Sequence, residues 1–569
     1  MQLRLWGPAS AGLILVALTV ASTGGLEAQQ QPDLVITNAQ IVDGTGAPAR
    51  RGAVVISQGR IVSVGDAAPA AARTIDARGR VLAPGFIDMH SHSDMPLVTD
   101  GNAQSKIRQG VTTEVIGESD SIAPRKATSE VASWTDFKGY FGVLEKNGIA
   151  VNLLSYIGLG TVRELVIGEG DRPATAADIK AMQAIVSEAM RQGVFGVSTG
   201  LIYPPNAYAS LEELVALSST AATMGGMHAS HLRYDGAKLR EGIEEILAIG
   251  ERAKMPVHIF HLKVTGAKNA GRMKEVVALV DAAQKRGARV SADQYPYVAS
   301  STSLTATIPD WAEEGGTAKL IERLKDPATR AKIRREMEDP NPSWENRYQS
   351  AGTWQNIQLA AIGRTRGVAD TNKTANRKYE GMRIAEAAKI AGKDPFDFVF
   401  DLLVEERGSV SCVYFIIAEE DLTLALKQPW VAIGSDGSAL ATEGPLRSGV
   451  PHPRSFGTFP RVLGRYVREL KAITLEDAIR KMTSLPASIL KLTDRGTIAP
   501  GKTADLVLFD PARVADRATF ENPFQYPVGI DTVVVNGQVV LDEGTHTGRR
   551  PGRVLRRPDA AGTTSKAGM

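Results

Sequence analysis

The sequence predicts an α/β fold: a (β/α)8 barrel of the TIM type, a small β-sandwich built from both chain ends, and an inserted subdomain. Three observations support this prediction. Short apolar runs alternate with amphipathic stretches through the middle of the chain, strand-like segments with tight turns occupy both ends, and one charged, Pro-rich segment interrupts the alternation. Alternating β and α segments are typical of a parallel sheet covered by helices.

Length and composition indicate a globular protein of several domains. The chain has 569 residues, 43% of them hydrophobic and 23% charged, which is too long for one simple core. We expect a signal peptide at 1–28, sandwich strands at 32–83, the barrel at 84–490 with an insert at about 305–379, further sandwich strands at 491–548, and a basic, partly disordered tail at 549–569.

The N-terminus has the pattern of a secretory signal. Arg4 precedes the apolar run Ala11–Ala21, and Leu26-Glu27-Ala28 supplies a cleavage site. The run is shorter than the roughly 20 apolar residues of a membrane span, although an uncleaved anchor is the alternative. We therefore expect an exported protein, periplasmic or secreted, with no stable membrane span after signal removal. Cys412 is the only cysteine, so no disulfide is expected.

Charge patterning argues against a nucleic-acid partner. The formal net charge is only +3, and the main basic cluster is the run of arginines between Arg549 and Arg557. No stacking aromatic residues are interleaved with these arginines, so a solvated tail is the better interpretation. The sequence does not specify an oligomeric state.

Both chain ends carry hairpin patterns, with β-branched residues on either side of turn formers. Three hairpins are predicted: 34–42 around Asn38, 54–64 around Gly59, and 532–540 around the Asn536-Gly537 turn. Two β-rich ends around a different middle predict one small sandwich completed by both termini.

The middle of the chain predicts the barrel. Strands are expected at 111–116, 194–198, 257–261, 289–293 and 430–436. Between them, apolar residues follow helical spacing at 182–190, and 239–254 and 274–286 are similar. A doubly wound open sheet shares this alternation, but no Gly-rich phosphate loop follows any strand, so the barrel is favoured. Residues 305–379 interrupt the alternation of strands and helices. They are expected to form either a lid over the barrel mouth or a helical surface segment with no functional role.

Histidines at predicted strand ends indicate a metal site. His90 and His92 end the run PGFIDMHSHSD, where positions i and i+2 of a strand face the same side. Two further pairs follow, His228 with His231 and His258 with His261, and the chain has only eight histidines. A spacing of three cannot place both members of a pair on one strand face. One or two Zn²⁺ ions are expected, because imidazole and carboxylate are ligands that suit zinc.

The run PGFIDMHSHSD resembles the first metal motif of the amidohydrolase superfamily. STGLIYPP, QPWVAIGSDG and HPRSFGTFPR are similar to segments of its N-acyl-D-amino-acid deacylase (D-aminoacylase) branch. The resemblance extends from Leu34 to the arginine-rich end. It implies that His231 and His261 are the ligands of their pairs, whereas His228 and His258 are buried and support the site.

One position departs from this branch. Its members carry a metal-binding Cys after the second barrel strand, and this chain has Gly117-Glu118-Ser119 there. Ser119 aligns most simply with the Cys. We expect Glu118 to be the ligand, because a carboxylate can bridge two metals and a neutral hydroxyl is a poor ligand.

Asp436, in Gly434-Ser-Asp-Gly437, is the predicted general base and a metal ligand. A carboxylate beside a metal-bound water can accept its proton and deliver that proton to the leaving amine. Segments that resemble the family's pocket and its HPRSFGTFPR run add Tyr203, Tyr295, Ser301 and His452 as weaker candidates for substrate contacts, and Lys263, two residues past His261, is a fifth.

The expected activity is metal-dependent hydrolysis of the amide bond of N-acyl-D-amino acids, with a small-molecule substrate. Two alternatives stay open. The first is a cyclic-amide hydrolase, like dihydropyrimidinase or dihydroorotase, or a dipeptidase on the same barrel. The second is an exported binding protein without catalysis, which the missing Cys would favour.

Overall fold

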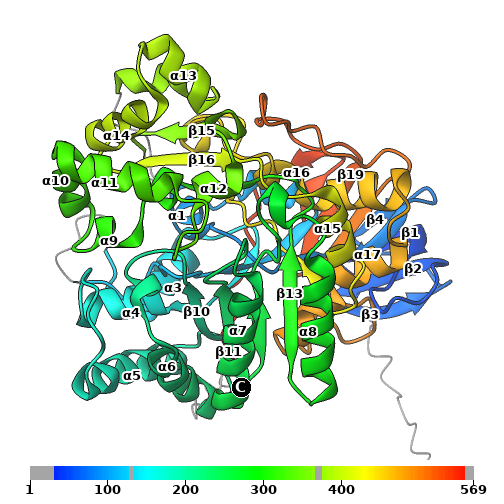
Figure 1. Ribbon diagram of the computed structural model, residues 1–569. Helices are drawn as coiled ribbons and strands as arrows, with labels where there is room; N and C mark the ends of the chain where they lie inside the picture. The colour runs from blue at the N-terminus through cyan, green and yellow to red at the C-terminus, as the bar shows by residue number, and fades with distance from the viewer. Residues whose placement is uncertain (1–30, 127–132, 365–373, 558–569) are drawn as a thin grey trace, which may run out of the picture.

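The computed structural model describes residues 31–126, 133–364 and 374–557. The predicted signal peptide and the last twelve residues of the predicted tail lie outside this part. Figure 1 shows three regions: a β-rich region made of both chain ends, a central barrel, and a helical region above the barrel. Within the described residues, no helix is long and apolar enough to cross a membrane.

The barrel consists of eight parallel strand positions, as the sequence predicts. Each strand is short, buried and bonded to its neighbours. In chain order they are β6 (Phe86–Asp88), β7 (Val111–Ile116), β8 (Asn152–Ser155) continued by β9 (Ile157–Gly158), β10 (Gly196–Gly200), β11 (Met227–His231), β12 (Val257–Ile259), β13 (Val290–Gln294) and β17 (Val431–Ile433). The ring closes where the Met89 amide donates to the Ile433 carbonyl at 3.3 Å.

Amphipathic helices cover the barrel from outside. In α5 (Ala176–Arg191), Met182, Val186, Ala189 and Met190 are buried, which confirms the predicted apolar face. Its first turn is fixed by a capping box between Thr175 and Asp178. Neighbouring helices pack in sequence order around the ring: α6 (Leu211–Thr223), α7 (Leu239–Ala253), α8 (Met273–Lys285) and α15 (Glu419–Leu426).

Strands from both chain ends form one nine-stranded sheet with its own apolar core. The central pairings join β5 (Val81–Pro84) to β1 (Leu34–Ile41) on one side and to β18 (Leu506–Phe509) on the other. The 54–64 hairpin is confirmed as β2 (Arg50–Ser57) and β3 (Arg60–Gly65), and the 532–540 hairpin as β19 (Ile530–Val535) and β20 (Gln538–Asp542).

The predicted hairpin at 34–42 is wrong. Residues 34–41 form the single strand β1, and the irregularity at Thr37-Asn38 is a bulge in its pairing with β2. Asn38 has a positive φ of 53° and donates to Asp76 Oδ1 at 2.9 Å. Asn tolerates this left-handed conformation, so the turn former distorts the strand without reversing it.

The insert between β13 and β17 is longer than the predicted 305–379. A three-stranded antiparallel sheet of β14 (Ser300–Ser303), β16 (Val410–Tyr414) and β15 (Ile357–Ile362) forms its base. Helices α9 to α12 lie between β14 and β15 in the chain, and α13 and α14 lie between β15 and β16. Their bounds are Asp310–Glu313, Thr317–Lys325, Pro327–Glu338, Arg347–Ala351, Ile384–Ala391 and Pro395–Glu405.

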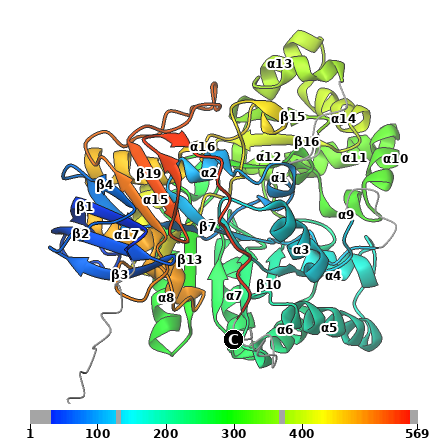
Figure 2. The same cartoon turned by 180° about the vertical axis from the view of Figure 1, so that it is seen from behind.

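In the described part of the predicted basic tail, Arg549, Arg550, Arg553 and Arg556 are exposed as expected, but the backbone is ordered against the barrel. The Leu153 amide donates to the Arg553 carbonyl at 2.9 Å, and the Leu555 amide donates to the Leu153 carbonyl at 2.7 Å. Val554 and Arg557 are buried. Figure 2 shows this red segment running from the β-rich region across the barrel. The segment is ordered because its backbone completes hydrogen bonds that β8 leaves open, which charge patterning cannot reveal.

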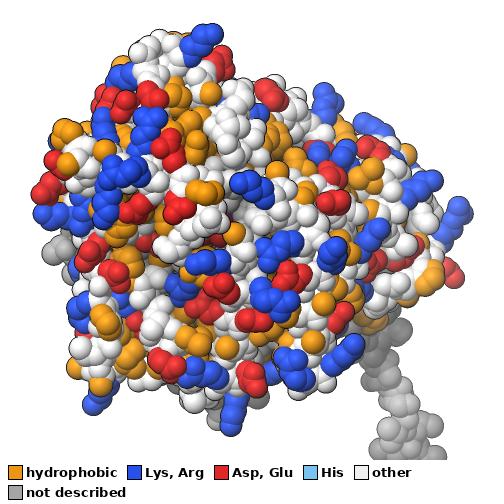
Figure 3. Space-filling model, in the orientation of Figure 1, with side chains coloured by type: hydrophobic (Ala, Val, Ile, Leu, Met, Phe, Trp, Pro, Cys, Tyr) orange, Lys and Arg blue, Asp and Glu red, His pale blue; other side chains and the backbone are white. Residues whose placement is uncertain are grey.

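Basic and acidic side chains are interspersed on the face shown in Figure 3, with apolar side chains scattered between them. No broad area of a single sign is visible on that face. Its pattern agrees with the small net charge of the sequence.

Helix α9 of the insert carries two half-buried carboxylates, Asp310 and Glu313. Burial and the neighbouring Asp310 raise the pKa of Glu313 to about 7. Between pH 4.5 and 7 the folded protein therefore holds a proton that the unfolded chain releases, so stability falls as pH rises through this window. Glu313→Gln is expected to stabilise the protein by about 1 kcal/mol at pH 8 and to have little effect at pH 4.

Thermal melts of Glu313→Gln at pH 4 and pH 8 measure this difference. The exposed neighbour Glu314 provides a matched control, since Glu314→Gln removes the same charge one residue away from the buried position. Equal melting-temperature shifts for the two variants at both pH values would contradict the role assigned to Glu313.

Candidate metal centre

Six predicted site residues lie together at the C-terminal end of the barrel, where β strands end and their loops begin. They come from five different strand positions, and most are buried. The six are His90 and His92 after β6, Glu118 after β7, His231 at the end of β11, His261 after β12, and Asp436 after β17.

Glu118 lies at the centre of this group. Its Oε2 atom is 2.9 Å from His90 Nε2 and 3.2 Å from His92 Nε2. Its Oε1 atom is 3.1 Å from His231 Nδ1 and 3.5 Å from His261 Nε2. Each carboxylate oxygen thus faces one pair of histidines, which is the arrangement expected of a carboxylate that bridges two metal ions.

Asp436 completes one side of the group. Its Oδ1 atom is 2.9 Å from His92 Nε2, and its Oδ2 atom is 2.7 Å from Arg454 Nη1. Burial disfavours the charged carboxylate, but Arg454 and His90 outweigh burial and hold the pKa of Asp436 well below its usual value. Asp436 is therefore ionised at neutral pH, which is the form that a general base requires.

The donor atoms fit zinc. Within the described residues, two sets place their ligand atoms within 4.8 Å of one another: His90, His92, Glu118 and Asp436, and Glu118, His231 and His261. Burial and the nearby Lys263 lower the pKa of His231 to about 4, and the same two causes hold the pKa of His261 well below its usual value. Both imidazoles are thus neutral, as metal ligation requires.

The other members of the two later pairs point elsewhere. His228 lies between Ser218 Oγ, 2.8 Å from its Nδ1, and Thr199 Oγ1, 3.1 Å from its Nε2. His258 lies between Ser291 Oγ and Asp293 Oδ2, each at 2.8 Å. Both imidazoles are fully buried and engaged at both nitrogens, so neither is available to the metal centre.

Four of the five substrate candidates line a cavity of about 600 Å³ together with the metal centre. The Tyr203 hydroxyl is 2.8 Å from Thr302 Oγ1, and Lys263 Nζ is 3.0 Å from His261 Nδ1 and 3.1 Å from Asp235 Oδ2. Tyr295 Oη is buried and has no hydrogen-bond partner among the described residues. The Ser301 carbonyl accepts a hydrogen bond from Arg454 Nη2 at 3.2 Å.

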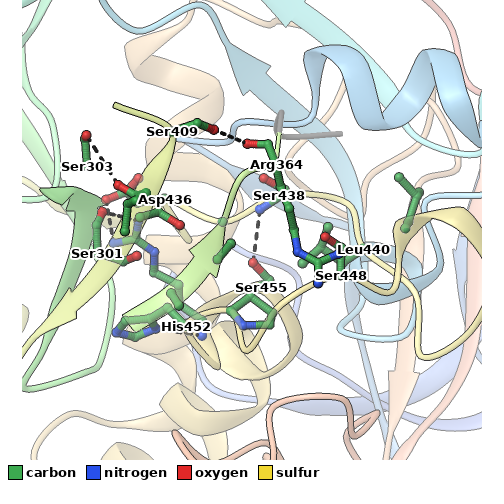
Figure 4. A pocket seen from close by; sticks show the side chains of 18 of the residues that line it. Ser301, Ser303, Arg364, Ser409, Asp436, Ser438, Leu440, Ser448, His452 and Ser455 are labelled. Carbon is green, nitrogen blue, oxygen red and sulfur yellow. Dashed lines mark hydrogen bonds and ion pairs between the residues drawn. The ribbon is translucent and has the colours of Figure 1, made fainter. Parts of the chain in front are cut away.

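The fifth candidate, His452, lies on the wall of a second cavity of about 290 Å³ that also reaches Asp436. Figure 4 shows this cavity with serines on several sides and Arg364 across from Asp436. His452 Nε2 donates to the Ala299 carbonyl at 3.0 Å, and its Nδ1 accepts from the Arg454 amide at 3.0 Å. Both nitrogens are engaged, so His452 holds Arg454 in place.

Sequence reasoning missed two arginines of this region. Arg454 lies two residues beyond His452 in the run HPRSFGTFPR. The resemblance of this run to the family could have indicated Arg454 as a site residue. Arg347 comes from α12 of the insert and is fully buried, with Nη1 2.6 Å from Asp235 Oδ1 and Nη2 2.9 Å from Asp235 Oδ2. No motif surrounds Arg347 in the sequence.

The amidohydrolase family model matches residues 73–541, so the chain belongs to the amidohydrolase family. It is 35% identical to the D-aminoacylase of Alcaligenes xylosoxydans xylosoxydans, over 94% of this chain and all of that protein. It is 32% identical to the N-acyl-D-glutamate deacylase of the same organism, over 93% of this chain and 97% of that protein.

Solved structures agree with these sequence relatives. One is the N-acyl-D-glutamate deacylase of Bordetella bronchiseptica with zinc and a phosphonate inhibitor that mimics the tetrahedral intermediate. Its TM-score is 0.77 at 32% identity, and 93% of this chain and all of that chain are covered. A D-aminoacylase structure concerned with its binuclear metal centre has a TM-score of 0.77 at 35% identity, covering 92% and 100%. A D-hydantoinase, 17% identical with a TM-score of 0.52, shares the fold.

Proposed function

We propose that this protein is a zinc-dependent hydrolase that cleaves N-acyl-D-amino acids into a carboxylate and a free D-amino acid. One observation carries the proposal: the Glu118 carboxylate lies between two histidine pairs, with Asp436 beside it in the same cavity. Relatives that match nearly the whole chain include a D-aminoacylase, an N-acyl-D-glutamate deacylase and an N-acyl-D-aspartate deacylase. The fit of donors to zinc supports catalysis over simple ligand binding.

Zinc would be held by the histidines, Glu118 and Asp436, and it would supply a water of lowered pKa and polarise the scissile carbonyl. Asp436 accepts a proton from the attacking water because its carboxylate is ionised. It is also close to the metal centre, since its Oδ1 atom lies 2.9 Å from His92, one of the residues that would hold zinc. As the carbon–nitrogen bond breaks, Asp436 returns that proton to the leaving amine nitrogen. The products are then a carboxylate and a free amine, and Asp436 is ionised again.

The α-carboxylate of the substrate belongs near Arg454 in this proposal. Arg454 is 2.7 Å from Asp436 Oδ2, and its guanidinium lies over the Tyr295 ring at 4.9 Å. Tyr295 Oη, buried without a partner among the described residues, can donate to a carboxylate, as can the Ser301 side chain on the same cavity wall. A guanidinium and two hydroxyls suit a planar anion.

Hydrolysis of paired N-acetyl-D- and N-acetyl-L-amino acids by purified protein tests this function. The assay is run after metal removal and again after zinc is restored, with Asp436→Asn in parallel. We expect zinc-dependent release from the D-isomers alone. Turnover of only cyclic amides or dipeptides would overturn the substrate assignment, and absence of turnover with any metal would leave the binding-protein alternative.

We also propose that the protein is exported. The apolar run Ala11–Ala21 after Arg4 and the single cysteine support this proposal. N-terminal sequencing of protein from the periplasmic and culture fractions tests it, since a mature end near residue 29 is expected. An intact N-terminus in the cytoplasmic fraction would contradict export.

A further inference from the structure

A fully buried lysine lies beside the metal centre and has no part in the proposed chemistry. Lys106, on the short helix α2 (Gln104–Ile107), has a side chain with no solvent exposure. Its Nζ atom is 2.7 Å from Asp88 Oδ2, 2.8 Å from Ser435 Oγ and 3.1 Å from the Gly437 carbonyl oxygen. Burying an ammonium group without such partners is costly, so this site is built to hold it.

The partners of Lys106 belong to the two segments that carry the metal-binding and catalytic groups. Asp88 is the last residue of β6, two before His90, and its Oδ1 atom accepts from the Ser435 amide at 2.7 Å. Ser435 is adjacent to Asp436, and the Ser435 hydroxyl donates to Asp88 Oδ2 at 2.6 Å. Lys106 therefore binds both segments at once, and it does not line the cavity that contains the metal centre.

The backbone between these segments is tightly constrained. The Asp436 amide donates to the His90 carbonyl at 2.7 Å, and the His92 amide donates to the Gly437 carbonyl at 3.0 Å. Asp436 itself has a positive φ of 48°, an uncommon conformation that must be held by its surroundings. The residues on both sides of Asp436 are held in place. Ser435 Oγ accepts a hydrogen bond from the Gly437 amide at 3.0 Å, and Lys106 contacts both Ser435 and Gly437.

A second carboxylate faces the same lysine. Glu114 of β7 lies with Oε2 3.5 Å from Lys106 Nζ and 2.5 Å from Ser93 Oγ, and it also accepts from Ser91. Ser93 and Ser91 flank His92, so Glu114 ties the histidine segment to β7, the strand that leads to Glu118. One ammonium thus joins the three segments that carry His90, Glu118 and Asp436.

We propose that Lys106 is a positioning residue that sets the distance between the His90/His92 pair and the Asp436 carboxylate. It touches neither substrate nor the ligand atoms, and it acts through Asp88, Ser435 and Gly437. The proposal rests on the proposed hydrolase function for its kinetic consequence. Its geometric consequence is independent of that function, because metal coordination depends on the same separation.

Lys106→Met tests the proposal, because methionine keeps the length of the side chain and removes its charge and donors. We expect kcat to fall by about 10- to 100-fold with KM within about threefold of wild type, as for residues that orient a metal ligand or base. The visible absorption spectrum of the cobalt(II)-loaded protein should change in band position or intensity. A folded variant with wild-type kcat and an unchanged cobalt spectrum would overturn the proposal.

Two further variants keep the test decisive. Lys481→Met removes another fully buried lysine, which binds the Gln428 and Val431 carbonyls before and in β17. The same kcat loss and spectral change in Lys481→Met would mean a general effect of losing a buried charge. If Lys106→Met does not fold, Ser435→Ala removes the hydroxyl that contacts Lys106, Asp88 and the Gly437 amide, and an unchanged cobalt spectrum in that variant overturns the proposal.

The cobalt spectrum also separates this proposal from the proposed function. A wild-type protein that hydrolyses no N-acyl-D-amino acid, but whose cobalt spectrum changes in Lys106→Met, would retain the positioning role and discard the hydrolase assignment. If the wild-type protein hydrolyses these substrates, and kcat and the cobalt spectrum are unchanged in Lys106→Met, the hydrolase assignment is retained and the positioning role is discarded.

Discussion

Asp436→Asn is expected to lower kcat by about 10³-fold, within the range typical of a lost general acid–base group. The asparagine amide keeps the shape of the carboxylate but cannot accept the proton of the attacking water at neutral pH. KM should change much less, because Arg454, Tyr295 and Ser301 still face the cavity. Steady-state kinetics with an N-acetyl-D-amino acid measure both quantities, and bound zinc is determined on the same samples.

A matched control separates lost chemistry from a broken ion pair. Asp516 pairs with Arg461 at 3.0 Å, and Arg461 ends the same helix, α16 (Arg454–Arg461), that begins with Arg454. Asp516→Asn therefore breaks a comparable pair away from the metal centre, and it should leave kcat within about twofold of wild type. If Asp436→Asn retained more than a tenth of wild-type kcat, Asp436 would not be the general base.

Glu118→Gln is expected to reduce bound zinc and to lower activity by about 10²-fold or more. A neutral amide is a weak zinc ligand, and it cannot present one negatively charged oxygen to each histidine pair. In the present geometry the two carboxylate oxygens serve different pairs, His90 with His92 and His231 with His261. Zinc content after dialysis and kcat with zinc restored are the measurements.

Ser119 supplies the control for Glu118, since Ser119 is the other candidate for the family's Cys position. Its Oγ atom is buried and has no hydrogen-bond partner among the described residues, and a neutral hydroxyl is a poor zinc ligand. Ser119→Ala should keep zinc content and activity. Loss of zinc in Ser119→Ala, with zinc retained in Glu118→Gln, would reverse the assignment.

Features that depend on neighbouring residues were predictable. The barrel strands are short buried runs, and helices such as α5 carry an apolar face at helical spacing, so both leave a local pattern in the sequence. His90 and His92 were recognisable for the same reason, since two histidines at i and i+2 follow a strand. Carboxylate chemistry favours Glu118 over Ser119 as a ligand, and Glu118 does lie among the histidines.

Features that depend on distant residues were not predictable. Arg347 matters because it meets Asp235, 112 positions earlier, and nothing near Arg347 announces that pairing. The 551–555 segment is ordered by the backbone of β8, about 400 residues away along the chain. At Asn38 the local pattern was present but ambiguous, since the same residue type accommodates a turn or a bulge.

The central position of β5 in the nine-stranded sheet has a consequence for how the chain is made. The partner β1 precedes β5 in the chain, but the other partner, β18, follows roughly 420 residues later. At about 5–20 residues per second, translation takes roughly 20–80 s to supply that partner. During this interval Val81-Leu82-Ala83 presents an apolar strand edge that can recruit another nascent chain. Protein released before β18 is synthesised should therefore aggregate, and chaperone binding to the N-terminal strands should persist until translation ends.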